Sequence, residues 1–246
     1  KWTLLASIAT MAATYLLKEE RPDPDYYDFD QLGAPVQTAT QATAFSTEVN
    51  GQRYLIKPLF DYQLEGVVVS YHDADSMADI WHHGRWQDFI NVRDLCVVWG
   101  NNVRSGVYRD MDFSNDSWTC WAYWPDRETR ARFSMTQLSN NHLLSDDEDL
   151  KSMLMAARPG DHIRLRGMLA AYANPGNGFQ RGSSTTRTDT GNGACETIFL
   201  QDFEIINEAN PGIRTLYAAS KWLSVVSLFG FIAMFIVAPV RKPGLR

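Results

Sequence analysis

Charged residues are missing from one long stretch near the end of the chain. Residues 222–240 (WLSVVSLFGFIAMFIVAPV) carry no charge, and about 20 apolar residues in a helix cross the hydrocarbon core of a bilayer. Basic residues flank this stretch on both sides, namely Lys221, Arg241, Lys242 and Arg246. A buried core helix would show at least one polar face, so the pattern predicts a transmembrane helix over 221–241.

The beginning of the chain carries a shorter apolar stretch. Residues 2–17 (WTLLASIATMAATYLL) lie between Lys1 and the charged sequence KEERPDPD. Such a stretch is compatible with a short membrane span, with the apolar core of a signal peptide, or with an amphipathic helix at the membrane surface. We favour a retained span over 1–18.

Between these two stretches the pattern divides into parts. Residues 19–52 combine acidic and Ala/Thr/Gln-rich sequence without periodicity, which predicts an extended linker. Residues 53–208 carry frequent strand signals and are predicted to fold as a β-rich domain. Residues 209–220 are then a connector to the C-terminal helix, and residues 242–246 are a short tail.

The β-rich part repeats a pattern of aromatic and β-branched positions that is typical of strands. Its first and longest run covers residues 54–71, where Pro58 and Gly66 mark an edge or a bend. Further strand patterns lie at residues 95–99, 117–124, 161–172 and 195–206, and a helical pattern lies at 135–157.

The order of these elements is three strands, a helix and two more strands. This order matches the five-stranded oligonucleotide/oligosaccharide-binding (OB) barrel, with its helix between the third and fourth strands. The sequence therefore predicts a membrane-anchored, β-rich α+β protein with a small OB-like barrel between its terminal helices. A different small barrel or a β-sandwich is compatible with the same pattern.

The net charge disfavours one class of partner, and the position of the basic residues predicts the orientation in the membrane. The chain has 23 Lys and Arg against 29 Asp and Glu, a formal charge of -6. Four of the basic residues are terminal, so the domain between the helices carries about -10, which disfavours nucleic-acid binding. Because Lys and Arg are enriched at cytoplasmic flanks of membrane helices, the basic tail predicts a cytoplasmic C-terminus. The domain then lies on the other side of the membrane, which in a bacterium means the periplasm, with the chain anchored in the inner membrane.

The three cysteines all lie in this domain. An oxidising compartment would allow one disulfide and leave one thiol over. Cys96 lies in the apolar run LCVVW and is interpreted as a buried core thiol. Cys120 and Cys195 are the candidate disulfide pair.

The densest group of potential metal ligands lies in residues 71–86 (YHDADSMADIWHHGRW). Imidazole and carboxylate groups bind divalent metals. The segment also contains Asp79, and the candidate ligands selected from it are His72, Asp73, Asp75, His82 and His83. Their spacing matches no closed zinc motif, and a polar loop with solvent-facing histidines is the alternative. On this pattern no cofactor is expected unless a divalent metal binds here.

A second candidate region is the segment 177–196 (NGFQRGSSTTRTDTGNGACE), which is rich in glycine and hydroxyl groups. Glycine permits close approach of a ligand or another chain, so Arg181, Arg187 and Asp189 are the candidate partner-binding residues. The glycines match no nucleotide-binding fingerprint, and a solvent-exposed loop is the alternative. Cys195 could act as a nucleophile only if a histidine lay near it in the fold.

Four segments carry a resemblance to a known group of proteins: DLCVVWG, SNNHLLSDD, GDHIRLRGMLAAY and especially RGSSTTRTDTGNGACETIFL. They resemble a bacterial family of uncharacterised membrane-anchored envelope proteins over about residues 54–207. That family has no established activity. The resemblance therefore implies a bacterial envelope setting and assigns no catalytic residue.

These features predict a non-enzymatic, membrane-anchored envelope protein that is an accessory or scaffolding subunit of a larger membrane assembly. Its expected partners are a membrane protein complex or further copies of the chain, together with the lipid bilayer. The alternatives are a periplasmic metal- or thiol-dependent hydrolase and a receptor module for a glycan, peptide or small ligand. Titratable groups converging in a cleft would favour the enzyme, and a groove lined by Trp and Tyr would favour the receptor.

Overall fold

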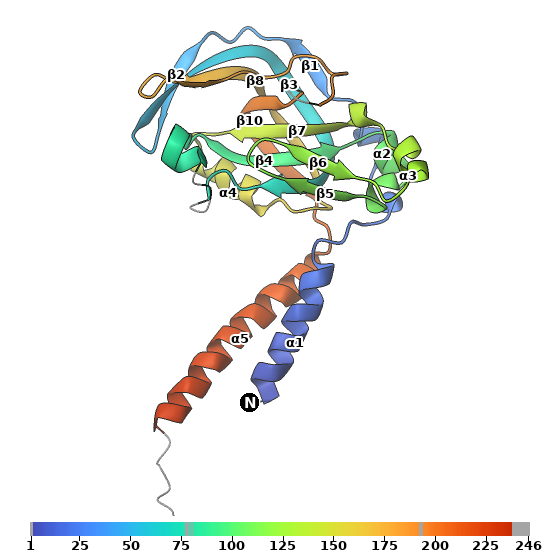
Figure 1. Cartoon of the computed structure of the whole chain (residues 1–246), viewed down its shortest axis with the longest axis vertical. Coiled ribbons are helices and arrows are strands. Elements are labelled where there is room, and N and C mark those ends of the chain that lie inside the picture. The colour runs from blue at the N-terminus through green and yellow to red at the C-terminus, as the bar shows by residue number, and fades with distance from the viewer. Residues whose placement is uncertain (1, 77–78, 80, 192–193, 238–246) are drawn as a thin grey trace, which may run out of the picture. The chain divides into compact units, whose positions relative to one another are not determined.

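The computed structural model divides into two units (Figure 1). One consists of residues 1–20 and 210–246, and the other of residues 21–209. The smaller unit holds the two apolar helices, and the larger unit holds every strand of the described residues. The structure describes residues 2–76, 79, 81–191 and 194–237.

The smaller unit contains two antiparallel helices, α1 (Trp2–Leu17) and α5 (Pro211–Val237) (Figure 1). Among the described residues, α5 is the one helix that is long and apolar enough to cross a bilayer, with 27 residues. α1 has 16 residues, or about 24 Å of helix against about 30 Å of hydrocarbon. The predicted C-terminal apolar helix is therefore confirmed, whereas the predicted N-terminal span is not supported.

Small and aromatic side chains join the two helices. Ser224 Oγ donates a hydrogen bond to Ser7 Oγ at 2.9 Å, and both side chains are buried. Tyr15 and Tyr217 pack with their ring centroids 6.0 Å apart. Small residues permit helices to approach closely, so α1 packs along α5 even though it is the shorter helix.

α5 begins earlier than the predicted span. Its first residue is Pro211, so most of the predicted connector 209–220 is helical. The last residues of the predicted span and the tail 242–246 lie outside the described residues.

The larger unit is built mainly of strands. They are β1 (Val36–Ala39), β2 (Phe45–Val49), β3 (Gln52–His72), β4 (Asn91–Val98), β5 (Asp112–Asn115), β6 (Cys120–Tyr123), β7 (Leu138–Leu144), β8 (His162–Asn174), β9 (Phe179–Arg181) and β10 (Glu196–Asn207). Its helices are α2 (Asn101–Arg104), α3 (Arg127–Arg132) and α4 (Glu148–Ala156). A π-helical turn covers Trp81–Trp86.

The strands of the main sheet pair in a cycle. β3 pairs with β4, β4 with β7, β7 with β10, β10 with β8, and β8 again with β3. The β7–β10 pair is parallel and the others are antiparallel. Gly167 of β8 permits the close approach of β10, because a side chain there would collide with the carbonyl oxygen of Phe199. The predicted β-rich α+β class is confirmed.

β4 is covered by apolar side chains on both faces. Leu95 and Val97 belong to one core cluster, and Cys96 and Val98 belong to another. Successive side chains of a strand point to opposite faces. A strand buried on both faces reads as a continuous apolar run, which is why the sequence around Cys96 lacks alternation.

The helix predicted over 135–157 is wrong in its first half. Leu138–Leu144 form β7, and the helix α4 covers only Glu148–Ala156. β7 is paired on both edges, with β4 and β10, and this tertiary pairing outweighs the local helical spacing of its leucines. The predicted third strand, 117–124, instead supplies β6, which pairs with β5 in a separate two-stranded sheet.

The segment 19–52 is not an extended linker. It supplies β1 and β2, which both pair with β3. Tyr27 and Leu32 are buried in the core, and the Tyr27 hydroxyl donates a hydrogen bond to the carbonyl oxygen of Gly160 at 2.7 Å. Isolated apolar anchors in an acidic segment produce no periodicity, so the sequence pattern does not reveal them.

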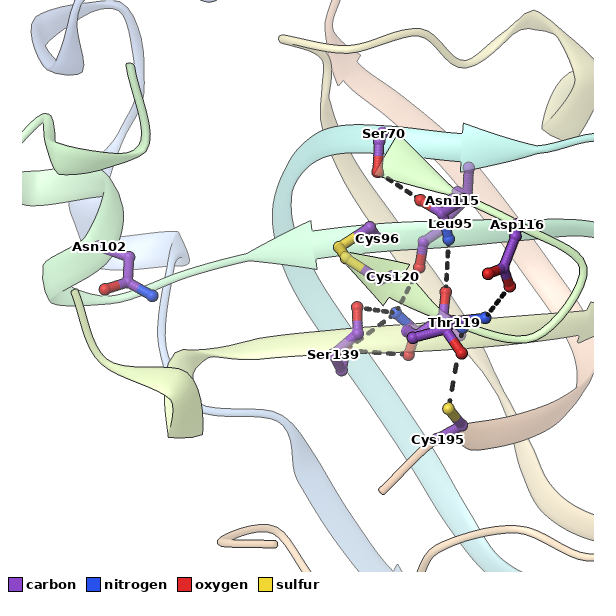
Figure 2. Close-up of a disulfide and its surroundings, with 12 residues drawn as sticks. Ser70, Leu95, Cys96, Asn102, Asn115, Asp116, Thr119, Cys120, Ser139 and Cys195 are labelled. Carbon is purple, nitrogen blue, oxygen red and sulfur yellow. Dashed lines mark hydrogen bonds between the residues drawn. A yellow bond between two sulfur atoms is a disulfide. The ribbon is translucent and has the colours of Figure 1, made fainter. Parts of the chain in front are cut away.

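Cys96 of β4 is bonded to Cys120 of β6 (Figure 2). The predicted pairing of Cys120 with Cys195 is therefore wrong, and Cys195 is a free cysteine. The β5–β6 hairpin packs against β4 and brings the two bonded Cα atoms to 5.8 Å, a distance suited to a disulfide. Cys96 is buried as expected, but as half of a disulfide and not as a thiol.

Loss of this disulfide should destabilise the larger unit. The bonded cysteines are 24 residues apart, for which loop-closure entropy gives about 3 kcal/mol. We expect Cys96→Ala/Cys120→Ala to lower the Tm by several degrees, and Cys195→Ala to change it by less than about 2 °C. Alkylation of the unreduced protein followed by peptide mapping should label Cys195 alone. A label on Cys96 would contradict the pairing.

Candidate functional site

Three titratable side chains stand side by side on neighbouring strands. His72 of β3 is in register with Asp94 of β4, and Asp94 is in register with His142 of β7. Directly opposed residues project from the same face of a sheet. The side chains of Asp94 and His142 are fully buried, whereas that of His72 is 24% exposed. This row forms the floor of the candidate site.

Asp94, His142 and Arg181 form a chain of polar contacts. Asp94 Oδ1 lies 2.7 Å from His142 Nδ1, and the Arg181 guanidinium donates to His142 Nε2. Because arginine can only donate, Nε2 carries no proton and Nδ1–H faces Asp94. Burial lowers the pKa of His142. Burial would raise the pKa of Asp94, but His142 and Arg181 outweigh it and lower that pKa.

Asp79 holds a second cluster together. Its Oδ2 lies 2.6 Å from His72 Nε2 and 2.7 Å from His82 Nδ1. Its Oδ1 accepts the backbone N–H groups of Trp81 and His82, each at 3.0 Å. Burial opposes ionisation of Asp79, but these hydrogen bonds outweigh it and lower its pKa. A carboxylate therefore lies between two imidazoles.

Asn91 of β4 connects the two clusters. Its Nδ2 lies 3.3 Å from His82 Nε2 and 3.2 Å from Asp94 Oδ1. Asp88 lies near the same nitrogen of His82, with its Oδ2 4.0 Å from Nε2, and it accepts a hydrogen bond from the Tyr172 hydroxyl at 2.7 Å. Burial raises the pKa of Asp88 to about 7. The buried polar groups thus form one continuous network.

Trp118, in the loop between β5 and β6, covers this network. Its ring centroid lies 4.1 Å from the Arg181 guanidinium, an attractive contact worth about 0.5–2 kcal/mol. The same ring lies 5.3 Å from the ring of His82. The hairpin is held by its disulfide and by a hydrogen bond from Ser70 to Asn115 (Figure 2). The cover is therefore fixed to the strands beneath it.

A pocket of about 900 Å³ opens beside this cover, within the range of about 300–1,000 Å³ typical of ligand sites. Residues 118–124 and the loop 181–195 supply most of its lining. The first segment contributes Trp121 and Trp124, which are 47% and 42% exposed. The loop contributes the polar side chains of Arg181, Ser183, Ser184, Asp189 and Thr190. Indole surface and hydroxyl groups thus share one cavity.

The predicted partner-binding residues make contacts within the chain. Arg181 is turned inward toward the buried network, as described above, and Arg187 donates to the carboxylate of Glu196. Asp189 accepts a hydrogen bond from Ser184 Oγ at 2.5 Å. Arg181 and Asp189 both line the pocket. Their role toward a partner stays a prediction.

Two of the five predicted metal ligands meet in the fold. His72 ends β3, and His82 lies in the π-helical turn. Asp79 of the same segment lies between them, and the ligand atoms of all three lie within 4.8 Å of one another. The segment therefore does contain a cluster of potential ligands, but the cluster consists of His72, Asp79 and His82 and not of the five predicted residues.

The other three predicted ligands lie elsewhere. Asp75 Oδ1 lies 3.2 Å from His83 Nε2, and this pair of side chains is separate from the cluster. Asp73 accepts a hydrogen bond from Arg93 Nε at 2.6 Å. Arg93 is fully buried and needs this carboxylate as a countercharge.

Cys195 packs against the cover. Its Sγ lies 3.6 Å from the carbonyl oxygen of Trp118 and 3.8 Å from Asn140 Nδ2. Burial raises the pKa of its thiol, and the thiolate is the reactive form of cysteine. This environment disfavours Cys195 as a catalytic nucleophile.

Asp94, His142 and Trp118 belong to the site although sequence reasoning did not select them. Asp94 lies within RDLCVVW and His142 within SNNHLL, and both polar residues belong to strands that are buried almost throughout. Burying such a residue without a partner is costly, so its presence in a buried strand is a usable signal for a polar network. Trp118 depends on how the hairpin folds, and the sequence gives no comparable signal for it.

Comparisons of the chain with protein-family models, with curated proteins and with solved structures found no match. The resemblance to a bacterial envelope family therefore stays a prediction. The pocket and the buried network are the observations from which a function can be proposed.

Glu196 should make stability depend on pH. Burial raises its pKa to about 7 from 4.5, although Arg187 opposes the shift. A carboxyl group with a raised pKa stabilises the fold when protonated, and this contribution is lost as the pH rises through about 7. The Tm of Glu196→Gln relative to wild type should therefore rise between about pH 5 and about pH 8, by the equivalent of at most about 3 kcal/mol.

The control for this experiment is Glu204→Gln, an exposed position on the same strand, which should show no such trend. A relative Tm of Glu196→Gln that falls with pH would mean that Arg187 stabilises the carboxylate by more than burial costs. Thermal unfolding in matched buffers measures both variants.

Proposed function

We propose that the larger unit is an OB-like barrel that binds an oligosaccharide, and that α5 anchors it at the periplasmic side of a bacterial inner membrane. The pairing order β3–β4–β7–β10–β8 corresponds to the strand order 1-2-3-5-4 of an OB barrel. The parallel pair joins its third and fifth strands. α4 lies between its third and fourth strands, as in that fold.

The pocket carries this proposal. OB barrels bind oligosaccharides and oligonucleotides at the face of the second and third strands and in the adjoining loops. Here Leu138, Ser139 and Asn140 of β7 line the pocket, together with the loop 181–195 that precedes the fifth strand. The cavity therefore lies where this fold places its ligands. An accessory subunit that acts only through an extended contact surface would not need such a cavity.

The lining favours a sugar over a nucleic acid. The exposed indoles of Trp121 and Trp124 can stack on the apolar C–H face of a sugar ring, while the serine, threonine and aspartate side chains of the loop can bind its hydroxyl groups. The chain carries a formal charge of -6, which repels phosphate backbones. An uncharged or weakly charged oligosaccharide fits both observations.

Three features support the proposed location in the inner membrane with the larger unit in the periplasm. α5 is apolar, and few residues of its most apolar stretch are buried in the chain, as expected for a helix that faces lipid. The Cys96–Cys120 disulfide is suited to an oxidising compartment such as the periplasm. The basic residues after the helix suit the cytoplasmic side.

Substitution in the pocket tests the ligand class. Trp121→Ala should weaken binding of cell-envelope oligosaccharides by about tenfold or more, because the stacking surface is lost. The matched control is Tyr123→Ala, on the same strand and similarly exposed but outside the pocket lining. Tryptophan fluorescence titration against a panel of glycan fragments, with an acidic peptide and a DNA oligonucleotide as competitors, measures the difference.

Binding of the peptide or the oligonucleotide with no glycan response would overturn the oligosaccharide proposal. Equal glycan affinities of Trp121→Ala and Tyr123→Ala would place the ligand outside this pocket.

The anchor makes a separate prediction. The full chain should stay with the membrane after alkaline carbonate extraction, and deletion of residues 211–246 should release it, because α5 supplies the apolar span. An alkaline phosphatase fused after residue 246 should be inactive and a fluorescent protein in the same place should fluoresce. The reverse pattern would place the tail in the periplasm and the main domain in the cytoplasm.

A further inference from the structure

We propose that His72, Asp79 and His82 form a binding site for a divalent transition metal of the Zn²⁺ class. The site is distinct from the oligosaccharide pocket and does not depend on the function proposed for it. Its three candidate ligand atoms are His72 Nε2, Asp79 Oδ2 and His82 Nδ1, which all lie within 4.8 Å of one another.

The cluster is held in place before any metal arrives. Asp79 Oδ1 is fixed by two backbone N–H groups at 3.0 Å, which leaves Oδ2 pointing at the two imidazoles. Asp79 and His82 are buried, and His82 is further fixed by the ring of Trp86 at 5.2 Å. A rigid set of ligands lowers the entropic cost of binding.

A second carboxylate stands where a metal-bound His82 would need it. A metal on Nδ1 of a neutral imidazole moves the ring proton to Nε2, and such N–H groups typically donate to a carboxylate or carbonyl. Asp88 Oδ2 lies 4.0 Å from His82 Nε2. Within the described part of the chain, Asp88 Oδ1 is buried without a hydrogen-bond partner. Asp88 is therefore positioned to accept that proton by a small movement.

The chemistry of the ligand atoms selects the metal. Two imidazole nitrogens with one carboxylate oxygen suit Zn²⁺ and its neighbours, whereas Ca²⁺ and Mg²⁺ prefer sites made of oxygen alone. Three protein ligands leave one position of a tetrahedral site for water or another small ligand. The 24% exposure of the His72 side chain gives the metal a route from solvent.

The metal also has electrostatic grounds to bind. Acidic side chains lie in this network, because Asp79 contacts both imidazoles of the cluster and Asp94 is joined to it through Asn91. Arg181 contacts the opposite end of the network, at His142. Among the residues that the structure describes, the His72 and His82 end of the network makes no hydrogen bond with Arg181. A divalent cation bound there would balance the negative charge of Asp79.

Metal titration of the full-length protein in detergent tests the site. After treatment with a chelator and removal of any affinity tag, wild type should bind one Zn²⁺ per chain with a Kd of about 10 µM or lower, by calorimetry or by competition with a chromogenic chelator. Co²⁺ should give the intense visible absorption of a tetrahedral site. Absence of Zn²⁺ binding by the wild type would overturn the proposal without reference to any variant.

Two neighbouring histidines provide a matched pair of variants. His72→Ala should weaken Zn²⁺ binding by about 100-fold or more, since a direct ligand is lost. His83→Ala removes a histidine of similar exposure, 23%, that pairs with Asp75 outside the cluster, and should retain affinity within about threefold. Cys195→Ser should also retain it, which excludes the free thiol as the ligand. Equal effects of His72→Ala and His83→Ala, with unchanged circular dichroism, would contradict the assignment.

Discussion

The buried carboxylate of Asp94 constrains much of this structure. A charge with no access to water must have partners at fixed positions, because an unpaired buried charge costs several kcal/mol. Asp94 meets this requirement with His142 on the next strand, Asn91 on its own strand and Arg181 beyond His142. These contacts join β4, β7 and β9. The register of the central strands and the inward turn of the 181–195 loop follow from the same requirement.

The β5–β6 hairpin covers this network and supplies one side of the pocket beside it. Residues of the hairpin segment 118–124 line the pocket, and its Trp118 lies against His82 and Arg181 of the polar network. The Cys96–Cys120 bond fixes the hairpin to β4, and Trp118 then lies over both Arg181 and His82. One indole therefore lies between the pocket and the histidine cluster. Trp118 lines the pocket and also contacts His82 of the histidine cluster, so the two proposed sites have this side chain in common. A ligand in one site could change the affinity of the other by displacing Trp118.

Contacts within the chain decide which charged groups of the 181–195 loop can reach a ligand. The arginines of the 181–195 loop neutralise buried acids of the chain itself, at His142–Asp94 and at Glu196. The polar surface that this loop offers to the pocket consists mainly of hydroxyl groups, with Asp189 and the inward-turned Arg181 as its charged groups. A hydroxyl-rich surface suits an uncharged ligand, whereas a loop with free arginines would attract phosphate. The ligand class therefore depends more on the contacts that these arginines make within the chain than on the number of arginines.

The sequence by itself determined the features that depend on local composition. The uncharged stretch ending α5 predicts the C-terminal apolar helix, and the dense aromatic and β-branched runs predict β3, β4, β8 and β10, because these signals need no knowledge of distant residues. The remaining features depend on strand pairing and on the disulfide, which join residues far apart in the sequence. β7 is a strand because it has neighbours on both edges, residues 36–49 join the sheet because β3 is long enough to receive them, and Cys120 bonds Cys96 because the hairpin folds back on β4.

The candidate site shows the same division. The segment 71–86 was visible as a group of potential ligands, but the choice of His72, Asp79 and His82 from it depends on the turn between β3 and β4. Asp94, His142 and Arg181 come from three separate segments and meet only when the strands pair in register. Sequence reports composition and short-range spacing, whereas the contacts that position these side chains join residues dozens of positions apart, so only the tertiary structure decides them.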